Sequence, residues 1–338
     1  MICEKALAEI KFNNKSYNQI MVATTLMGAA FILSICIGRY HISVKEIIDI
    51  FMGIEVTEMT RRVFFSLRLP RTIMALIAGV GLSISGSVYQ TVFKNPLATP
   101  DLIGVSSGAN LGVAIAISFF AGSTLSIATF AFIGGLGAVF IALFLARISN
   151  NKGITTFVLA GIVISSTAQG LIMLLKYMAD PERHLAAIEY WSMGSFAGIT
   201  GEKLLSVLPC FMIGMIGIFL LKWQINILSL SDEEGKSLGV KVGIIRVIVI
   251  IFITLVVASI VSVTGLISFI GLIGPHIARM LTKKNNFNTT LLSGIIGATI
   301  LLVADTLARS IGSSEVPISI LTTFIGAPFL AYLMSRLN

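Results

Sequence analysis

VGIIRVIVIIFITLVVASIVSVTGLISFIGLIGPHIARML, residues 242–281, is a 40-residue apolar block that decides the fold of this chain. A helix crosses a bilayer with roughly 20 mainly apolar residues, so the block is too long for one crossing and needs a break. The residues that supply the break are Gly265, Gly271, Gly274 and Pro275. We expect a partly extended second crossing whose helix starts near Pro275, which lipid tolerates only if protein buries the irregular backbone.

The rest of the chain repeats this apolar composition. Of its 338 residues, 56% are hydrophobic and only 12% are charged, whereas soluble domains carry about 25% charged residues. Apolar runs of spanning length recur ten times, at 19–38, 72–93, 102–120, 124–146, 154–175, 203–221, 242–263, 265–281, 289–308 and 317–335. Runs of this length predict an all-α polytopic membrane protein, because only helices pair their own backbone groups in lipid. We expect residues 1–338 to form one transmembrane domain, since no polar gap is long enough for a soluble domain.

Lys and Arg in the connecting segments predict the orientation. Ten crossings put both ends on one side, and that side holds 14 of the 24 Lys and Arg residues but only 6 of the 16 acidic residues. We therefore expect a multi-pass protein of the cell membrane with both termini in the cytoplasm. The inner face accounts for the net charge of +8, so nucleic acid is not needed as a partner.

The stretch KNPLATPDLIGVSSGAN, residues 94–110, separates two apolar runs. Its two prolines and Asp101 predict an inner turn between two helices. Gly104, Gly108 and Gly112 recur every four residues, so they share a helix face and permit close approach of another backbone. Small polar side chains in lipid need a partner or water, and a cluster of them here favours an aqueous path: Ser106, Ser107 and Asn110.

SLSDEEGKSLGVKVG, residues 229–243, is the longest polar stretch on the inner side. It is not a phosphate-binding loop, because that motif requires a glycine five residues before Gly235, where Leu230 stands. The stretch instead predicts a short acidic helix that Ser231 caps and Gly239 ends. Such a helix is either a solvated connection or a docking surface for a partner.

Charged residues near the outer side can be explained by structural roles. RLPR, residues 68–71, opens the second span, and its arginines can anchor the helix at the interface. Asp305 and Arg309 are four residues apart and can pair on one helix face. Glu315 precedes the last span, where a carboxylate suits the positive end of a helix dipole.

Catalytic signatures are missing from the sequence. It contains no HExxH motif, no GxSxG elbow and no cluster of His, Cys and acidic residues at metal spacing. We therefore expect no catalytic residue, no metal site and no cofactor bound by this chain. A passage that a partner drives is the leading interpretation. The alternatives are an ion-gradient-driven secondary transporter, which the scarcity of intramembrane charge disfavours, and an intramembrane enzyme.

Four blocks of the sequence resemble the membrane permease subunit of type II ABC importers, the uptake permeases for iron-siderophores, haem and cobalamin. The blocks are RLPRTIMALIAGVGLSISGSVYQTVFKNPLATPDLIGVSSGAN, DEEGKSLGV, GLISFIGLIGPHIARML and ADTLARSIGSSEVPISILTTFIGAPFL, in order from about residue 60 to the C-terminus. The resemblance implies a homodimer of ten-helix subunits, or a pair of related subunits, with the path on the dimer axis.

The same resemblance implies further partners and a cargo. Two cytoplasmic ATPase subunits would bind ATP and Mg²⁺, and an extracytoplasmic binding protein would deliver a metal chelate. Ferric siderophores are the commonest cargo of the family, while haem, cobalamin and even an oxyanion remain open.

Carried over by motif, the resemblance also assigns roles to residues. The acidic loop helix is similar to the coupling helices that seat in the ATPase, here Ser231, Asp232, Glu233, Glu234, Gly235, Leu238 and Gly239. Basic side chains that would meet acidic residues of the binding protein are Arg68, Arg71 and Arg309. Path-lining residues of the fifth span would be Ser165, Ser166, Thr167 and Gln169, beside those of the third.

An inner gate and one departure complete the assignment. RISNNKG, residues 147–153, resembles the gate, with Ser149, Asn150 and Asn151 at the narrowest place. Gly235 stands where the family usually has alanine. Glycine would loosen this short helix by up to about 1 kcal/mol.

Overall fold

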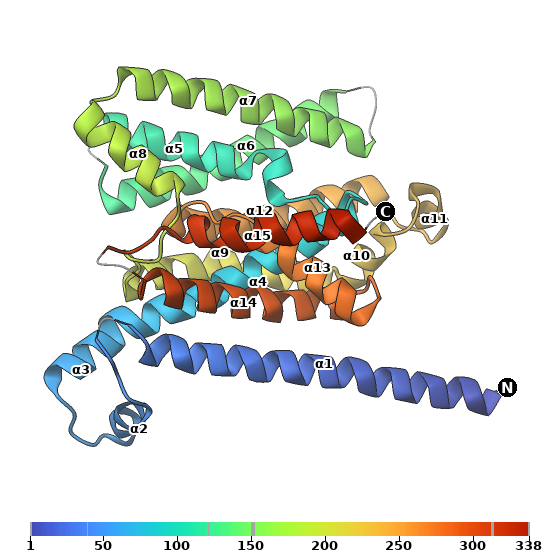
Figure 1. Cartoon of the computed structure of the whole chain (residues 1–338). Coiled ribbons are helices and arrows are strands. Elements are labelled where there is room, and N and C mark those ends of the chain that lie inside the picture. Colours follow the sequence, from blue (N-terminus) through green and yellow to red (C-terminus); the bar gives the residue numbers. More distant parts are fainter. Residues whose placement is uncertain (1, 39, 121, 150–152, 312–313, 337–338) are drawn as a thin grey trace.

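The computed structural model describes residues 2–38, 40–120, 122–149, 153–311 and 314–336 (Figure 1). All regular secondary structure in these ranges is helical. The helices are α1 (Ile2–Cys36), α2 (Val44–Met52), α3 (Glu58–Arg62), η1 (Val63–Arg68), α4 (Leu69–Val92), η2 (Pro100–Ile103), α5 (Val105–Phe119), α6 (Thr124–Ile148), α7 (Ile154–Met178), η3 (Pro181–Leu185), α8 (Ala186–Ser192), α9 (Gly201–Leu220), α10 (Lys222–Leu228), α11 (Asp232–Ser237), α12 (Val242–Thr264), α13 (Ile270–Thr282), α14 (Phe287–Ala308) and α15 (Ile318–Arg336).

Each of the ten expected apolar runs contains a helix, which confirms the all-α prediction. In chain order these helices are α1, α4, α5, α6, α7, α9, α12, α13, α14 and α15. Within the described ranges, seven stretches are long and apolar enough to cross a membrane by themselves, and α5 and α15 are shorter apolar helices. Helix α13 has 13 residues, roughly 20 Å, which is less than the roughly 30 Å of a hydrocarbon core.

The break in the apolar block 242–281 lies between α12 and α13 and is covered by protein, as expected. Residues 265–269 are not helical. Of the carbonyl groups at the break, that of Thr264 accepts the backbone N–H of Ser195 at 2.7 Å, and that of Leu266 accepts the Ser319 hydroxyl at 2.6 Å. Neighbouring segments therefore satisfy backbone groups that lipid could not.

The expected start of the second helix in this block is wrong by five residues. Helix α13 begins at Ile270, so Pro275 lies inside it. A proline cannot donate to the carbonyl four residues before it, which here is that of Gly271. The Gln90 side-chain amide donates to the Gly271 oxygen at 3.2 Å instead. This contact from α4 explains why the proline does not end the helix.

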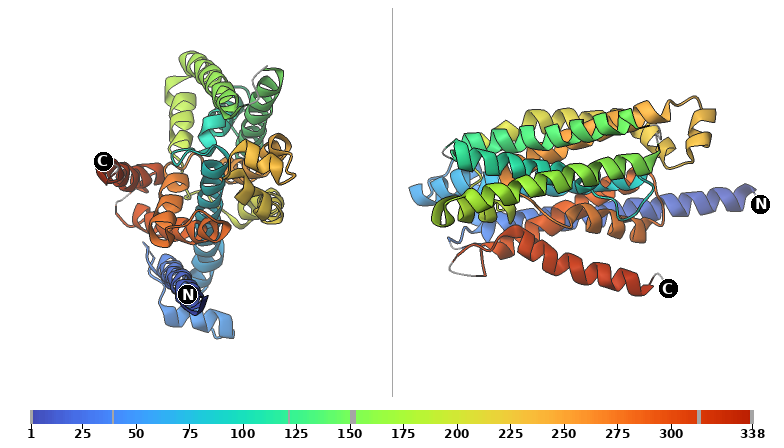
Figure 2. Two further views of the ribbon diagram at one scale, coloured as in Figure 1. Left: turned by 90° about the vertical axis from the view of Figure 1, so that its right-hand side faces the viewer. Right: turned by 90° about the horizontal axis from the view of Figure 1, so that it is seen from above.

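Helix α4 runs through the centre of the bundle, while α1 and α7 lie at opposite edges (Figures 1 and 2). The apolar span that contains α4 is 78% buried, whereas the spans of α1 and α7 are each 22% buried. Figure 2 shows α15 set apart on one side of the bundle. Helix α7 therefore presents most of its surface outside this single chain.

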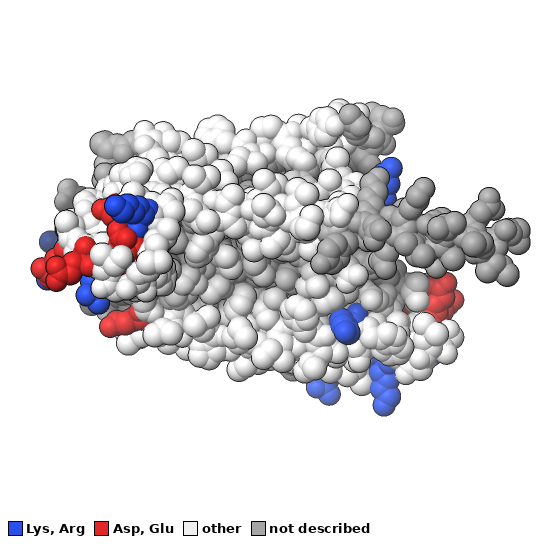
Figure 3. All heavy atoms as spheres, turned by 90° about the horizontal axis from the view of Figure 1, so that it is seen from below, with Lys and Arg blue, Asp and Glu red and all other residues white. Residues whose placement is uncertain are grey.

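The charged side chains gather at the two ends of the molecule (Figure 3). One end carries α2 and α3 and is called the α2 end. The other carries α11 and the N- and C-terminal ends of the chain, and is called the α11 end (Figure 1). Between them, the face drawn in Figure 3 shows a broad belt without Lys, Arg, Asp or Glu. A belt of this kind suits the hydrocarbon region of a bilayer.

Candidate translocation path and partner surfaces

The acidic loop at the α11 end folds into the predicted short helix, α11. The Ser231 hydroxyl accepts the backbone N–H of Glu234 at 3.2 Å, and the Glu234 carboxylate accepts the backbone N–H of Ser231 at 2.8 Å. This reciprocal capping box satisfies two donors at the start of the helix. Gly239 follows the helix with φ of 79°, a conformation that favours glycine. The local sequence therefore specifies α11 from both sides.

Asp232 ties α11 to the rest of the protein, a role that sequence reasoning missed. Its Oδ1 atom lies 2.9 Å from Lys94 Nζ, in the loop after α4, and 2.9 Å from Arg246 Nη2 on α12. Burial raises the pKa of Asp232, but the hydrogen bonds from Lys94 and Arg246 outweigh it and leave the pKa below its ordinary value. The two cations are 138 and 14 residues away in sequence, so no local pattern could have revealed the contact.

The remaining side chains of α11 divide into a packed side and an exposed side. Glu233, Glu234 and Leu238 are exposed, and Leu238 is 55% accessible. Gly235 is buried, and a Cβ atom there would lie 2.8 Å from Val242 Cγ2. Glycine at this position therefore lets α11 pack closely on α12. This close packing accounts for the glycine, although glycine also loosens the helix.

The predicted docking arginines lie at the α2 end, in or beside one long helical stretch. The RLPR segment does not open a helix: α3, η1 and α4 continue one another from Glu58 to Val92. The Leu69 N–H donates to the Phe64 oxygen in the π-helical turn η1, and Pro70 follows it. Arg68, in that turn, donates to the carbonyl oxygens of Ile37 and Tyr40, the latter at 3.0 Å.

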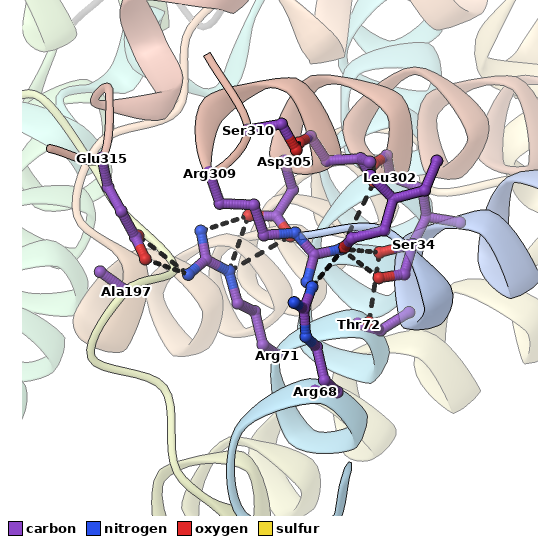
Figure 4. A network of polar contacts seen from close by, with 12 residues as sticks. Ser34, Arg68, Arg71, Thr72, Ala197, Leu302, Asp305, Arg309, Ser310 and Glu315 are labelled. Atoms are coloured by element: carbon purple, nitrogen blue, oxygen red, sulfur yellow. Dashed lines mark hydrogen bonds and ion pairs between the residues drawn. The ribbon is translucent and has the colours of Figure 1, made fainter. Parts of the chain in front are cut away.

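Arg71 joins two carboxylates that are distant in sequence (Figure 4). Its Nη2 atom lies 2.8 Å from Asp305 Oδ1 on α14, and its Nη1 atom lies 2.9 Å from Glu315 Oε2 in the segment before α15. The Asp305 side chain is fully buried, and that of Glu315 is 30% exposed. Glu315 precedes α15, as the sequence indicated, and its ion pair with Arg71 is a contact that the sequence did not reveal.

Arg309 completes the cluster. It donates to the backbone oxygen and the hydroxyl of Ser34, the latter at 2.8 Å, and its Nε lies 3.6 Å from Asp305 Oδ2. Its Nη1 atom is buried and has no hydrogen-bond partner among the described residues. A cavity of about 280 Å³ opens beside the cluster, and its lining includes Tyr40, Arg68, Arg71, Ala197, Arg309 and Glu315.

The geometry of the three arginines differs from that of protruding basic side chains. Arg68, Arg71 and Arg309 are only 7%, 8% and 5% exposed, because their guanidinium groups point into the protein toward carboxylates and carbonyls. Their assignment to docking stays a prediction. A partner could meet them only through the cavity that they line.

The predicted path residues of α7 lie on its outward surface. Ser166, Thr167 and Gln169 are exposed in the single chain, and Ser165 is partly buried beside Gly104. The Thr167 hydroxyl donates to the Val163 oxygen of the same helix, but hydrocarbon would offer no partner to Ser166 and Gln169. Their position therefore favours a face of α7 that protein or water covers, and their role in a path stays a prediction.

The predicted path residues of α5 lie partly buried in the bundle. Ser106, Ser107 and Asn110 are all of intermediate exposure, and the side-chain oxygen of Asn110 has no hydrogen-bond partner among the described residues. The predicted close packing of this helix is present: a Cβ atom at Gly108 or Gly112 would overlap the backbone of α6. The glycines therefore set the distance between α5 and α6.

The expected inner turn at 94–101 is only partly correct. The chain leaves α4 at the α11 end, but η2 then folds back against α7, where the Leu102 oxygen touches Gly161. Asp101 consequently lies inside the bundle beside Ser106, whose hydroxyl donates to its carboxylate. The signal in the sequence was a charged residue next to a proline between two apolar runs. The sequence could not show how deep in the bundle that charged residue lies.

The predicted gate can be placed only in part. Ser149 ends α6 in an extended conformation, with φ of −62° and ψ of 140°. Asn150 and Asn151 lie outside the described residues. The gate assignment stays a prediction.

Comparison with known proteins identifies the family. The FecCD transport family matches residues 26–336. The chain is 37% identical to the molybdate import system permease protein MolB of Haemophilus influenzae, over 96% of this chain and 97% of the relative. It is 38% identical to a Helicobacter pylori protein described as the probable permease of an iron chelatin transport system, over 81% and 82%. The chain therefore belongs to the FecCD transport family.

A solved structure supports the same assignment. It is described as an inward-facing conformation of a metal-chelate type ABC transporter, and it covers 94% of this chain and 98% of its own at 36% identity, with a TM-score of 0.85. The protein is thus a multi-pass membrane permease subunit of an ABC importer. It is a transport subunit and not an enzyme, because ATP hydrolysis in such importers belongs to a separate subunit. Family membership excludes the secondary-transporter and intramembrane-enzyme alternatives.

Protonation of Asp232 and Glu234 should destabilise α11, and it should do so only in acid. Hydrogen bonds from the Ser231 backbone and hydroxyl lower the pKa of Glu234, and that of Asp232 is lowered as described above. Their unfolded values are about 4.3 and 3.9, so their stabilisation is complete above those values and is lost as the pH falls through the lower folded values. We expect amide-exchange protection factors across 231–239 to stay constant from pH 8 to 5 and to fall below about pH 4.

Two variants separate the causes of this effect. Asp232→Asn should lower protection of α11 at pH 7 by at least about fivefold: the partly exposed Lys94 pair contributes no more than about 1 kcal/mol, and the buried Arg246 side chain also loses its partner. Glu233→Gln removes a charge from the same helix without touching the cap or the two cations, so protection should not change. A loss of protection near pH 6 in the parent chain would contradict this account.

The Arg71–Asp305 pair should dominate stability at the α2 end. Arg71→Met leaves the buried Asp305 carboxylate with only the longer Arg309 contact, and we expect a loss of about 3 kcal/mol. Glu315→Gln should cost no more than about 1 kcal/mol, because Glu315 is partly exposed. Thermal unfolding in detergent measures both.

Arg62→Met is the matched control. It removes the exposed Arg62–Glu58 pair, whose side chains are 74% and 77% exposed, so the unfolding temperature should hardly move. Equal destabilisation by Arg62→Met and Arg71→Met would show that burial of the pair has no special weight.

Proposed function

We propose that this chain is one of two identical subunits that form the translocation path of an ATP-driven importer for a ferric siderophore. An extracytoplasmic binding protein would deliver the chelate at the α2 end. Two cytoplasmic ATPase subunits, which bind the ATP and Mg²⁺, would seat on α11. The observation that carries the proposal is the exposed acidic side of α11, held in place by Asp232 at the end opposite the arginine cluster. This chain itself binds no cofactor in the proposal.

Identical pairing is supported by the exposed surface of α7. Its span is only 22% buried, and its outward surface mixes apolar side chains with Ser166, Thr167 and Gln169. The Thr167 hydroxyl donates to the Val163 oxygen at 2.8 Å, but lipid would offer no partner to Ser166 and Gln169. A second copy facing α7 would cover the apolar part and leave the polar part along a water-filled axis.

The orientation follows from the two ends. The chain termini and α11 share one end (Figure 1), and the connecting segments predicted to lie there carry the excess of Lys and Arg. Such an excess is typical of the cytoplasmic side. We therefore assign the α11 end, with both termini, to the cytoplasm and the α2 end to the exterior.

The relatives support more than one cargo. The Helicobacter pylori relative is described for iron chelatin and the solved structure as of metal-chelate type, which supports a ferric chelate. The Haemophilus influenzae relative is described for molybdate, so molybdate is the second candidate.

Reconstitution with the cognate ATPase and binding protein tests the proposal. We expect ATP-dependent accumulation of a radiolabelled ferric siderophore, and a fall of at least tenfold when Glu233→Lys and Glu234→Lys are combined. The matched control reverses the same number of charges at the other end, with Glu55→Lys and Glu58→Lys, and should keep the ATPase seated. Uptake of molybdate but not of the siderophore would select the second cargo, and uptake without ATPase would reject the proposal.

A docking prediction follows from the cavity beside the arginines. An acidic side chain of the binding protein that enters it would lie beside Arg309 and compete with Glu315 for Arg71. Arg309→Gln should therefore weaken capture of the binding protein, and Glu315→Gln should strengthen it, each by several-fold at low salt and less at high salt. Surface-bound dimer titrated with binding protein measures this.

The direction of the Glu315→Gln effect decides the outcome. If capture weakens, Glu315 supports the docking surface rather than competing with the partner. If neither variant changes capture in a folded protein, the arginines serve only the fold.

A further inference from the structure

Asp101 lies deep in the bundle rather than at the membrane surface. The Leu102 oxygen beside it touches Gly161, and Gly104 lies beside Ser165. At 1.5 Å per residue, Gly161 is about 10 Å and Ser165 about 17 Å from the start of α7, and both are about 20 Å or more from its end. Both ends of α7 are thus far from this level. The carboxylate of Asp101 therefore sits within the membrane thickness, where charge is costly unless it meets water or a cation.

In the part of the chain that the structure describes, the surroundings of Asp101 contain polar groups but no cation. It lines a cavity of about 100 Å³ together with Thr99, Ser106 and Ser268. The other lining residues are Leu82, Pro100, Val257, Val261, Leu266, Ile267, Phe269 and Gly271, so Asp101 is the one ionisable side chain in this lining. Among the described residues it forms no ion pair, and its side chain accepts one hydrogen bond, from Ser106.

Exposure indicates that water supplies the missing partners. Asp101 is exposed in the single chain although the segments around it are buried. The cavity lies between α7 and α15: Gly104, three residues after Asp101, touches α7, and Phe269, in the cavity wall, touches Gly326 of α15. Asp101 thus lies beside α7, whose exposed polar side chains belong to the proposed path.

The cavity wall also contains strained backbone. Phe269 has φ of 67°, a conformation that a bulky residue adopts only when its surroundings impose it. Strain of this kind is concentrated at functional sites. The residue is held between the cavity and α15.

A purely structural role for Asp101 does not account for its charge. Asp101 lies one turn before α5, where a negative charge suits the helix dipole by about 0.3–1 kcal/mol. An asparagine would accept the Ser106 hydrogen bond equally well without the cost of a charge in the membrane. The charge itself therefore needs another explanation.

We propose that Asp101 determines the charge class of the cargo. Its fixed negative charge on the path favours neutral or cationic metal chelates, such as ferric hydroxamates, and rejects oxyanions such as molybdate and strongly anionic chelates. This rests on the proposed importer function and selects between its two candidate cargoes. In water, a unit charge about 6 Å from a dianion opposes it by about tenfold, and less polar surroundings strengthen the effect.

A cysteine reporter tests the field without any transport. In a chain with its cysteines replaced by serine, Ser268→Cys places a thiol in the same cavity wall. We expect a cationic methanethiosulfonate to react faster than an anionic one of equal size, and Asp101→Asn to lower that ratio of rates about tenfold. Ser237→Cys on α11 is the control, and its ratio should not depend on Asp101.

Either of two results would overturn the proposal. If the ratio at residue 268 is the same with Asp101→Asn, the carboxylate does not act on the passage. If neither reagent reaches residue 268 in the permease without its ATPase while residue 237 reacts, the cavity is closed to water-borne solutes.

Uptake by the reconstituted importer gives the second measurement. Asp101→Asn should raise the ratio of molybdate to ferrichrome uptake at least several-fold, and Asp101→Glu should restore the parent ratio. If Asp101→Asn leaves this uptake ratio unchanged while both cargoes are carried, only the role of Asp101 is rejected and the proposed importer function stands. If the parent importer carries neither cargo, the proposed function is rejected. The cysteine reporter still tests independently whether the Asp101 charge acts on the cavity.

Discussion

Direct contact between helix backbones at glycine is the constraint on which the rest of this structure depends. A Cβ atom at Gly79 of α4 would overlap Ala298 and Gly297 of α14, and one at Gly86 would overlap the Gly271 oxygen near the start of α13. Lipid gives apolar helices no hydrophobic reason to associate, so close packing and hydrogen bonds must hold them together. The glycines bring the backbones near enough for Ser83 to donate to Ser293 O at 2.7 Å and for Gln90 to reach Gly271.

This close packing at α4 makes the irregular segments possible. Residues 265–269 and η2 could not face lipid, because their backbone groups would be unpaired. Buried against α4, α7 and α15, they form instead the wall of a cavity that contains Asp101. The break in the apolar block 242–281 thus has a consequence beyond fitting two crossings into 40 residues: it places non-helical backbone and a charge beside the proposed passage.

Ionic contacts then fix the two ends of the bundle. Arg71 and Asp305 join α4 to α14 at one end, and Asp232 joins α11 to α12 and to the loop after α4 at the other. The buried pair is the costlier to break, because neither charge can recover water. The partly exposed one leaves the acidic side of α11 free for a partner. A firmly held helix α11 at one end and an arginine-lined cavity at the other suit a protein that binds partners at both ends.

The amino-acid sequence by itself determined the ten helical runs, the all-α class, the break near Gly265 and the capped helix at Ser231. These depend on length, polarity and turn chemistry within a few residues, which local physics decides. Only the tertiary structure decided that Arg68, Arg71 and Arg309 are buried, that Glu315 binds Arg71, that Pro275 lies inside a helix, and that Asp101 lies at depth. Each depends on a partner far away in the chain, such as Asp305 for Arg71 or Gln90 for Gly271, and such a partner is defined only once the helices have packed.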